Sequence, residues 1–185
     1  MIIGNFIKEI EVKYKNWYFS GLCFDSSKCK KDNIFFAIKG TKIDGNKFIS
    51  HAIQKGAKII ISNQKFQGIR KNILFIRSSN VRKSLSELAY TIFKDKPKNI
   101  IAVTGTNGKS SVAEFYFQIL KLNKKKVASI GTLGIKTQNY IKKVSNTTID
   151  PITLSMILNK LKKEKINDVI LEASSHGLKQ NRLDG

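Results

Sequence analysis

The feature that most constrains this chain is an apolar run that leads through a glycine-rich loop into a helical segment. Residues 100–103 read Ile-Ile-Ala-Val, which is typical of a buried strand, and residues 108–122 form the predicted helix. The loop region contains Gly105, Thr106, Asn107, Gly108, Lys109, Ser110 and Ser111. Because a glycine loop between a strand and a helix binds phosphate groups, the sequence predicts an α/β fold that binds a nucleoside triphosphate here.

The residue types of this loop suit ATP and Mg²⁺. Glycine lets the backbone N–H groups turn toward the phosphates. Lys109 can reach the β- and γ-phosphates, and the Ser110 hydroxyl is placed to bind Mg²⁺. The general phosphate-loop pattern has a further glycine where this chain has Val103. The alternative is a tight strand–helix turn with an incidental lysine, which the specificity of the run disfavours.

The rest of the second half alternates strands and helices. Apolar runs at residues 127–130 and 168–171 predict two more strands, and Pro151 suits the first turn of a helix between them. This order is typical of a parallel sheet with right-handed crossovers. Three strands make a small sheet with an uncovered face or edge, so residues 97–185 look like part of a larger domain. We expect the isolated chain to aggregate or to have a loosely packed second half.

The first half predicts a separate small α/β domain over residues 1–96. Strands are predicted at residues 34–38, 59–61 and 73–76, and a helix after Phe48 ends at Gly56. A second helix carries apolar side chains from Leu85 to Phe93, with Ser79 or Asn80 as its N-cap, and it ends before Pro97.

Composition limits the class of protein. Lys and Arg total 34 against 13 acidic residues, a net charge of +21, which can indicate a nucleic-acid surface. The lysines are spread along the chain, however, and its richness in Lys, Ile and Asn resembles genomic bias, so we expect no nucleic-acid partner. The sequence has no apolar run of the roughly 18 residues that span a bilayer and no evident signal peptide. A cytoplasmic monomer without a membrane partner is expected, with Cys23 and Cys29 reduced.

Four segments together resemble one family. The loop from Gly105 to Ser111 resembles the nucleotide loop of the Mur ligase family, which replaces the first glycine of the general pattern. The other matching segments are residues 25–27 ahead of 32–37, then 146–148, then 172–178 with Gln180 and Arg182. They narrow the resemblance to the branch that adds the third residue of the peptidoglycan stem peptide. The resemblance covers essentially the whole chain, but only somewhat over a third of a typical member.

The resemblance implies a fold and a set of substrate contacts in the first half. The fold is a small α/β UDP-binding domain followed by the first half of a P-loop-type parallel-sheet central domain. The implied contacts to UDP are Phe24, Ser26, Thr41, Lys42 and Ile43. The family usually has leucine in place of Phe24. For residues 41–43 an ordinary turn is an equal alternative.

The resemblance also places the acceptor substrate and Mg²⁺ in the second half. The implied contacts to the muramoyl dipeptide are Asn146, Thr147 and Thr148, and those to the acyl substrate are Ser174, Gln180 and Arg182. Lys109 and Glu172 are the implied catalytic residues, and Glu172 ends a strand where it could hold Mg²⁺ with Ser110. As alternatives, Thr148 or Asp150 could merely cap the next helix, and Glu172 could be an exposed strand-end acid.

The implied reaction joins meso-diaminopimelate or L-lysine to UDP-N-acetylmuramoyl-L-alanyl-D-glutamate with ATP. The acceptor carboxylate attacks the γ-phosphate to give an acyl-phosphate, and the amine then displaces phosphate. The family also uses a carbamylated lysine and an amino-acid-selecting C-terminal domain that these 185 residues do not include, so the chain alone is expected to be inactive. Two alternatives stay open: another ligase of the superfamily, of the folylpolyglutamate or cyanophycin synthetase type, and a non-enzymatic basic nucleotide-binding module.

Overall fold

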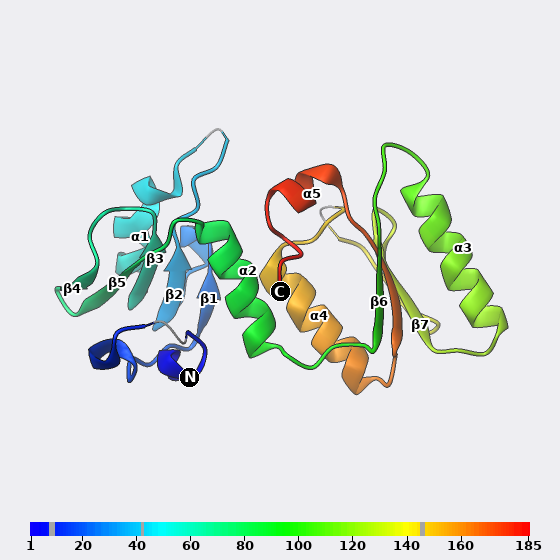
Figure 1. Cartoon of the computed structure of the whole chain (residues 1–185), viewed down its shortest axis with the longest axis horizontal. Coiled ribbons are helices and arrows are strands. Elements are labelled where there is room, and N and C mark those ends of the chain that lie inside the picture. Colours follow the sequence, from blue (N-terminus) through cyan, green and yellow to red (C-terminus); the bar gives the residue numbers. More distant parts are fainter. Residues whose placement is uncertain (8–9, 42, 145–146) are drawn as a thin grey trace. The chain divides into compact units, whose positions relative to one another are not determined.

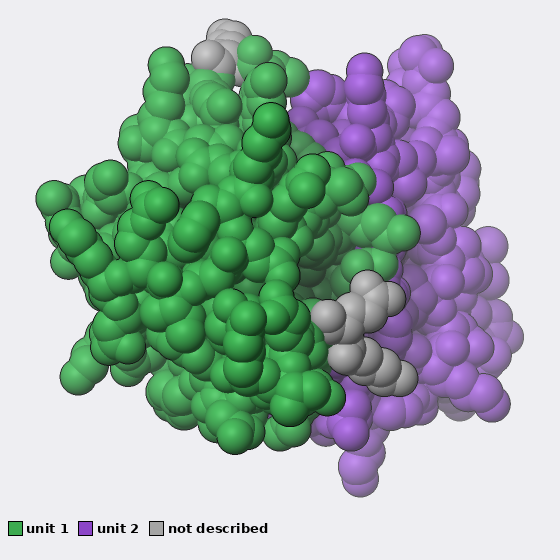
Figure 2. Space-filling view, turned by 60° about the vertical axis from the view of Figure 1, so that its left-hand side comes forward, with its two compact units in different colours: residues 1–88 green, residues 89–185 purple. Residues whose placement is uncertain are grey.

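The computed structural model describes residues 1–7, 10–41, 43–144 and 147–185, which form two compact units. Residues 1–88 form the first unit and residues 89–185 the second (Figure 2). The division falls within α2 (Val81–Ile92), a few residues before the predicted boundary at residue 96. Each unit contains its own five-stranded sheet (Figure 1).

The first unit is a sheet of four parallel strands and one antiparallel strand, in the order β1-β2-β3-β5-β4. Its strands are β1 (Gly21–Cys23), β2 (Asn33–Phe36), β3 (Ile59–Ser62), β4 (Gly68–Arg70) and β5 (Ile73–Arg77). Its helices are α1 (Ile49–Gln54), most of α2, and the 3₁₀ helices η1 (Ile3–Asn5), η2 (Val12–Tyr14), η3 (Ser26–Lys28) and η4 (Gly45–Phe48).

The predicted strands of this unit are confirmed. β2 is buried on both faces, since the side chains of Ile34, Phe35 and Phe36 are at most 1% exposed, and a strand buried on both faces reads as a continuous apolar run. Asn80 accepts a hydrogen bond from the Lys83 N–H at 3.0 Å, which confirms it as the N-cap of α2.

The second unit has the sheet order β6-β10-β7-β8-β9. Its strands are β6 (Asn99–Val103), β7 (Val127–Gly131), β8 (Gly134–Lys136), β9 (Ile141–Lys142) and β10 (Asp168–Glu172). Its helices are α3 (Lys109–Leu122), α4 (Pro151–Lys163) and α5 (Ser175–Lys179). The prediction of three strands was incomplete: β6, β10 and β7 are parallel as predicted, but the antiparallel hairpin β8-β9 extends the sheet beyond β7. These strands of three and two residues are too short for a periodic pattern.

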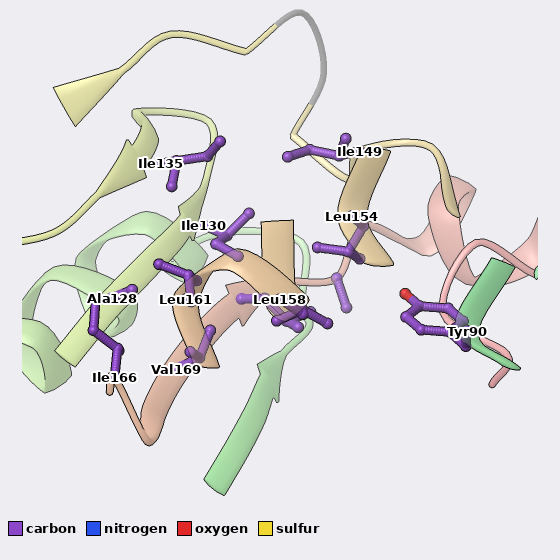
Figure 3. Packing of buried hydrophobic residues seen from close by; sticks show 12 residues of the cluster. Tyr90, Ala128, Ile130, Ile135, Ile149, Leu154, Leu158, Leu161, Ile166 and Val169 are labelled. Carbon is purple, nitrogen blue, oxygen red and sulfur yellow. The ribbon is translucent and has the colours of Figure 1, made fainter. Parts of the chain in front are cut away.

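Helices α3 and α4 lie on opposite faces of this sheet (Figure 1). On one face, Leu154, Leu158 and Leu161 of α4 pack with Val169 of β10 in a buried cluster (Figure 3). Because successive side chains of a strand point to opposite faces, Ile170 and Glu172 point to the face that carries α3. Glu172 is the last residue of β10, and this alternation places its side chain on the same face of the sheet as α3, the helix that follows the phosphate loop.

The outer surface of α3 is apolar. Val112, Phe115, Ile119 and Leu122 recur at helical spacing and are exposed, from 49% for Val112 to 81% for Leu122. Ile101 on the edge strand β6 is also 41% exposed. Among the helices in the described ranges, none is both long and apolar enough to cross a membrane. An uncovered apolar helix face and an open strand edge favour association between molecules.

We therefore expect the isolated chain to self-associate through α3. Changing Phe115 and Ile119 together to lysine should shift the sedimentation profile at high protein concentration toward the monomer, because the variant removes exposed apolar area and adds like charge. Gln118→Lys is the matched control, since it adds charge on the same helix without removing apolar surface. A double variant that sediments like the parent chain would show that this stripe is not the contact.

The two thiols of the first unit are free and buried. Cys23 and Cys29 are 5% and 6% exposed and belong to the same apolar cluster. Burial raises the pKa of both thiols, and that of Cys29 to about 12. Because the thiolate is the reactive form, the raised pKa and the burial make both thiols unreactive near neutral pH. We expect Ellman's reagent to modify two thiols per chain in denaturant and almost none in the native chain; rapid labelling of the native chain would contradict this burial.

Candidate functional site

The phosphate loop lies between β6 and α3, as predicted. Gly105 and Gly108 have φ angles of 147° and 79°, in the region that favours glycine, and Gly108 is the left-handed N-cap of α3. Lys109 folds back over the loop: its Nζ donates to the carbonyl oxygens of Gly105 at 2.6 Å and Thr106 at 3.3 Å. The lysine ammonium and the N-terminus of α3 therefore face the same loop, an arrangement that attracts phosphate.

Glu172 lies beside this loop and is held by three donors. Because β10 pairs between β6 and β7, its carboxyl end is next to both the loop and the end of β7. The Ser110 hydroxyl donates to Glu172 Oε2 at 3.1 Å, the Thr132 N–H to Oε1 at 3.0 Å, and the Thr132 hydroxyl to Oε2 at 3.0 Å. Glu172 is only 3% exposed, so the alternative of an exposed strand-end acid is wrong. A buried carboxylate with several partners is typical of a functional position.

The sequence analysis did not predict two residues of this cluster, Gly131 and Thr132. A Cβ at position 131 would lie 2.2 Å from Glu172 Oε1, so only glycine lets β7 pass this close to the carboxylate. A signal was present, because residues 131–132 directly follow a predicted strand and so fall at the carboxyl edge of the same sheet, where ligands bind in open α/β folds.

The segment before α4 joins the cluster through two threonines. Thr147 and Thr132 share a hydroxyl–hydroxyl hydrogen bond of 3.0 Å. The Thr148 hydroxyl donates to the Glu172 carbonyl oxygen at 3.2 Å and lies 2.8 Å from the Ser174 N–H and 2.9 Å from the Ser174 hydroxyl. Asp150 caps α4 by accepting from a backbone N–H, so helix capping does not explain Thr148. Asn146, predicted beside these threonines, lies outside the described residues.

Arg182 is oriented beside Thr148. Its Nη1 donates to the Thr148 carbonyl oxygen, and its Nε and Nη2 donate to Gln180 Oε1 at 3.0 and 2.7 Å. These two hydrogen bonds to Gln180 fix the orientation of the guanidinium group, which is only partly buried. The guanidinium group still has N–H protons on Nη1 and Nη2 that it can donate to a carboxylate or phosphate.

The phosphate loop and the cluster around Glu172 line one cleft of about 330 Å³. Its lining residues are Thr106, Asn107, Gly108, Lys109, Ser110, Ser111, Thr132, Thr147, Glu172 and Ser174. The structure therefore brings together most of the predicted nucleotide residues with Glu172, Thr147 and Ser174, while Gln180 and Arg182 are not among the lining side chains. All the side-chain donors and acceptors at this point are oxygen or nitrogen groups that suit a phosphorylated ligand.

The cleft fits Mg²⁺ in its donor chemistry. Within the described ranges, no three His, Cys, Asp or Glu side chains gather closely enough to hold a metal ion by themselves. Mg²⁺ in nucleotide sites is usually held by one or two protein oxygens together with phosphates and water. The Ser110 hydroxyl and the Glu172 carboxylate, 3.1 Å apart at the end of the phosphate loop, match that pattern.

A second set of predicted residues lies in the first unit. Phe24 follows β1, and Thr41 and Ile43 follow β2, so both segments come after the carboxyl ends of adjacent parallel strands, where ligands bind in open α/β sheets. Phe24 is 41% exposed and Ile43 is 59% exposed; Thr41 is exposed, and Lys42 lies outside the described residues. The Gly40 N–H donates to the Ile43 carbonyl oxygen at 2.9 Å.

Ser26 is buried in this group and has a partner that the sequence did not indicate. Its hydroxyl lies 3.0 Å from Nδ1 of His51, in α1. The preceding Asp25 accepts from the Ser27 N–H at 3.0 Å and hydroxyl at 2.7 Å, and the Ser27 hydroxyl bond holds the pKa of that carboxyl below its usual range. The hydrogen bond to His51 and the bonds between Asp25 and Ser27 together hold the turn that carries Ser26 in place.

Both halves of the chain match models of one sequence family. Residues 18–97 match the Mur ligase family, catalytic domain, and residues 103–185 match the Mur ligase middle domain. This chain belongs to the Mur ligase family. The prediction of the family and of its α/β fold is therefore confirmed.

The following two relatives carry the same enzyme name. The UDP-N-acetylmuramoyl-L-alanyl-D-glutamate–2,6-diaminopimelate ligase of Rickettsia prowazekii is 41% identical over 174 residues, which is 92% of this chain and 36% of the relative. The protein of the same name from Buchnera aphidicola subsp. Schizaphis graminum is 40% identical over 173 residues, 89% of this chain and 35% of the relative. The chain thus spans about a third of the length of these relatives.

Solved structures give the same fold. A structure of a UDP-N-acetylmuramoyl-L-alanyl-D-glutamate–2,6-diaminopimelate ligase superimposes with a TM-score of 0.83 at 28% identity, covering 100% of this chain and 38% of that one. MurF ligase from Thermotoga maritima in complex with ADP superimposes with a TM-score of 0.54 at 21% identity, covering 83% of this chain and 32% of that one. At that identity the second similarity shows the fold alone.

Proposed function

We propose that this chain supplies the UDP-substrate site and the nucleotide site of an ATP-dependent ligase. The proposed reaction joins meso-diaminopimelate to UDP-N-acetylmuramoyl-L-alanyl-D-glutamate in cytoplasmic peptidoglycan precursor synthesis. The observation that carries the proposal is the single cleft in which Lys109, Ser110 and Glu172 meet Thr147 and Ser174. Diaminopimelate, rather than L-lysine, is favoured because the relatives are named as diaminopimelate ligases.

The nucleotide half of the cleft serves the first step. Lys109 and the backbone N–H groups at the start of α3 would bind the β- and γ-phosphates of ATP, which needs Lys109 to leave the carbonyl oxygens of the loop. Ser110 and Glu172 would hold Mg²⁺, which when bound neutralises charge that develops on the phosphates. A ligase with the same fold has been solved in complex with ADP, which supports nucleotide binding by this chain.

The other half would orient the acceptor. The acceptor carboxylate attacks the γ-phosphorus, which forms an acyl-phosphate and releases ADP. The amine of the amino acid then attacks the acyl carbon, an amide bond forms, and phosphate leaves with the bonding electrons while the amine loses a proton. Thr147 and Arg182 would supply hydroxyl and guanidinium donors for the acceptor, while Gln180 orients Arg182 and the buried Thr148 hydroxyl ties this segment to the end of β10.

The activity is tested in a protein of the relatives' length that carries this sequence. With Mg·ATP and UDP-N-acetylmuramoyl-L-alanyl-D-glutamate, mass spectrometry should detect the diaminopimelate adduct and release of phosphate, while L-lysine gives far less product. The 185-residue chain alone should form no product. If phosphate release did not depend on the muramoyl dipeptide, the ligase assignment would be wrong.

We expect Ser26→Ala to weaken UDP binding by roughly tenfold or less, because a neutral hydrogen bond contributes about 0.5–1.5 kcal/mol. Calorimetric titration of this chain with UDP measures the effect. Ser27→Ala is the matched control, since that hydroxyl is bonded to Asp25 and is not a predicted contact. Equal UDP affinity for Ser26→Ala and the parent chain would remove Ser26 from the proposed site.

A further inference from the structure

Thr132 touches Glu172 with both of its donors. Its backbone N–H donates to one carboxylate oxygen and its hydroxyl to the other, each at 3.0 Å. The third donor to this carboxylate is Ser110, which the proposed function assigns to Mg²⁺. A hydroxyl has one proton and two lone pairs, so Ser110 can offer a lone pair to a cation while it still donates to Glu172, and both bonds from Thr132 can also remain.

The hydroxyl protons define a direction through the cluster. A threonine hydroxyl has one proton to donate, and Thr132 uses it for Glu172 Oε2. The 3.0 Å bond between Thr132 and Thr147 must then be donated by Thr147. The Thr147 hydroxyl therefore donates to the Thr132 hydroxyl, which in turn donates to the Glu172 carboxylate. A ligand oxygen that takes the Thr147 proton competes directly with Thr132.

We propose that Thr132 is a positioning residue that fixes Glu172 for the nucleotide-bound cation and couples this carboxylate to the acceptor loop at Thr147. The inference rests on the proposed function, because it takes the nucleotide and the muramoyl dipeptide as the two ligands. When the acceptor engages Thr147, the hydrogen bonding of Thr132, and through it that of Glu172, changes. By linkage, each ligand then alters the affinity for the other by the same factor.

A purely structural role for the Thr132 hydroxyl is disfavoured by its position. Thr132 is exposed at the rim of the cleft, whereas Glu172 beneath it is 3% exposed. In Thr132→Val the Ser110 hydroxyl still donates to Oε2 and the backbone N–H of residue 132 to Oε1, so both carboxylate oxygens keep a partner and we expect the variant to fold. Val keeps the N–H bond to Oε1 and removes only the hydroxyl, while Thr132→Ser restores the hydroxyl.

The test titrates this chain with Mg·ADP in the absence and presence of UDP-N-acetylmuramoyl-L-alanyl-D-glutamate. We expect Thr132→Val to bind Mg·ADP roughly tenfold more weakly, which is the effect of one lost hydrogen bond to a charged group. We also expect the acceptor to lose its influence on that affinity. Thr132→Ser should restore both properties. Thr137→Val removes a buried hydroxyl beyond β8 and away from the cleft, so it should lose stability but keep the Mg·ADP affinity of the parent chain.

A second measurement needs no ligand. In ¹⁵N–¹H spectra of the free chain, Thr132→Val should move the Thr147 amide resonance, and Thr132→Ser should leave it near its original position. An unmoved Thr147 resonance in Thr132→Val would overturn the coupling whether or not nucleotide binds. Unchanged Mg·ADP affinity in Thr132→Val, or equal weakening in the Val and Ser variants, would overturn the role of the hydroxyl. If the parent chain bound no Mg·ADP while the resonance moved as expected, the nucleotide part of the proposed function would fail instead.

Discussion

Lys109→Ala is expected to abolish measurable binding of Mg·ATP to this chain. In the structure the Lys109 ammonium is held against the loop by the carbonyl oxygens of Gly105 and Thr106. In the proposed nucleotide complex it would exchange these for charged phosphate oxygens. Two charge-assisted bonds at about 1.5–3 kcal/mol each correspond to a loss of roughly 100-fold or more.

Calorimetry with ATP and with ADP measures this loss. Lys121→Ala is the matched control, because it removes one positive charge from the other end of the same helix, and it should bind ATP like the parent chain. This control separates a local contact from general attraction by the net charge of +21, which weakens with added salt. If Lys109→Ala and Lys121→Ala bound ATP equally well, the loop would not be the nucleotide site.

The phosphate loop could be predicted from the sequence because its chemistry is contiguous. Strand, glycines, lysine and serine follow one another, so no knowledge of the tertiary fold is needed to place Lys109 and Ser110. Glu172 could be predicted nearly as well, since the carboxyl end of a parallel strand faces the ligand edge of the sheet. The long buried strands and α4 were predictable for a similar reason: each has its own apolar pattern.

The partners of Glu172 could not be assigned in this way. In the chain β7 precedes β10, but in the sheet β10 lies between β6 and β7. Only this order brings Gly131 and Thr132 against Glu172. His51 is a similar case, because it lies in a different element from Ser26, 25 positions along the chain. The hairpin β8-β9 was missed because strands this short have no detectable periodicity. The ligand contacts assigned to all the site residues remain predictions, and two of those residues, Lys42 and Asn146, lie outside the described residues.

Gly131→Ala is expected to cost the chain both stability and metal-dependent nucleotide binding. The added Cβ would lie 2.2 Å from Glu172 Oε1 and 2.4 Å from its Cδ, so the carboxylate must move. Movement breaks its bonds to Thr132 and Ser110 in a buried site, at a cost of about 1–3 kcal/mol for each unsatisfied group. We expect Mg·ADP affinity to fall roughly 100-fold and the free energy of unfolding to fall by about 2–3 kcal/mol.

A double-mutant cycle with Glu172→Ala isolates the cause. All three atoms nearest to the added Cβ belong to the Glu172 side chain beyond its own Cβ, and Glu172→Ala removes them. In that background Gly131→Ala should therefore cost little further stability, and the two single changes should be strongly non-additive in urea unfolding. Gly21→Ala is the control in the first unit, where the added Cβ would meet only Asn33 Nδ2 at 3.1 Å. If Gly131→Ala destabilised the chain equally with and without the Glu172 side chain, the strain would lie in the backbone of β7. Position 131 would then be glycine for a reason unrelated to the carboxylate.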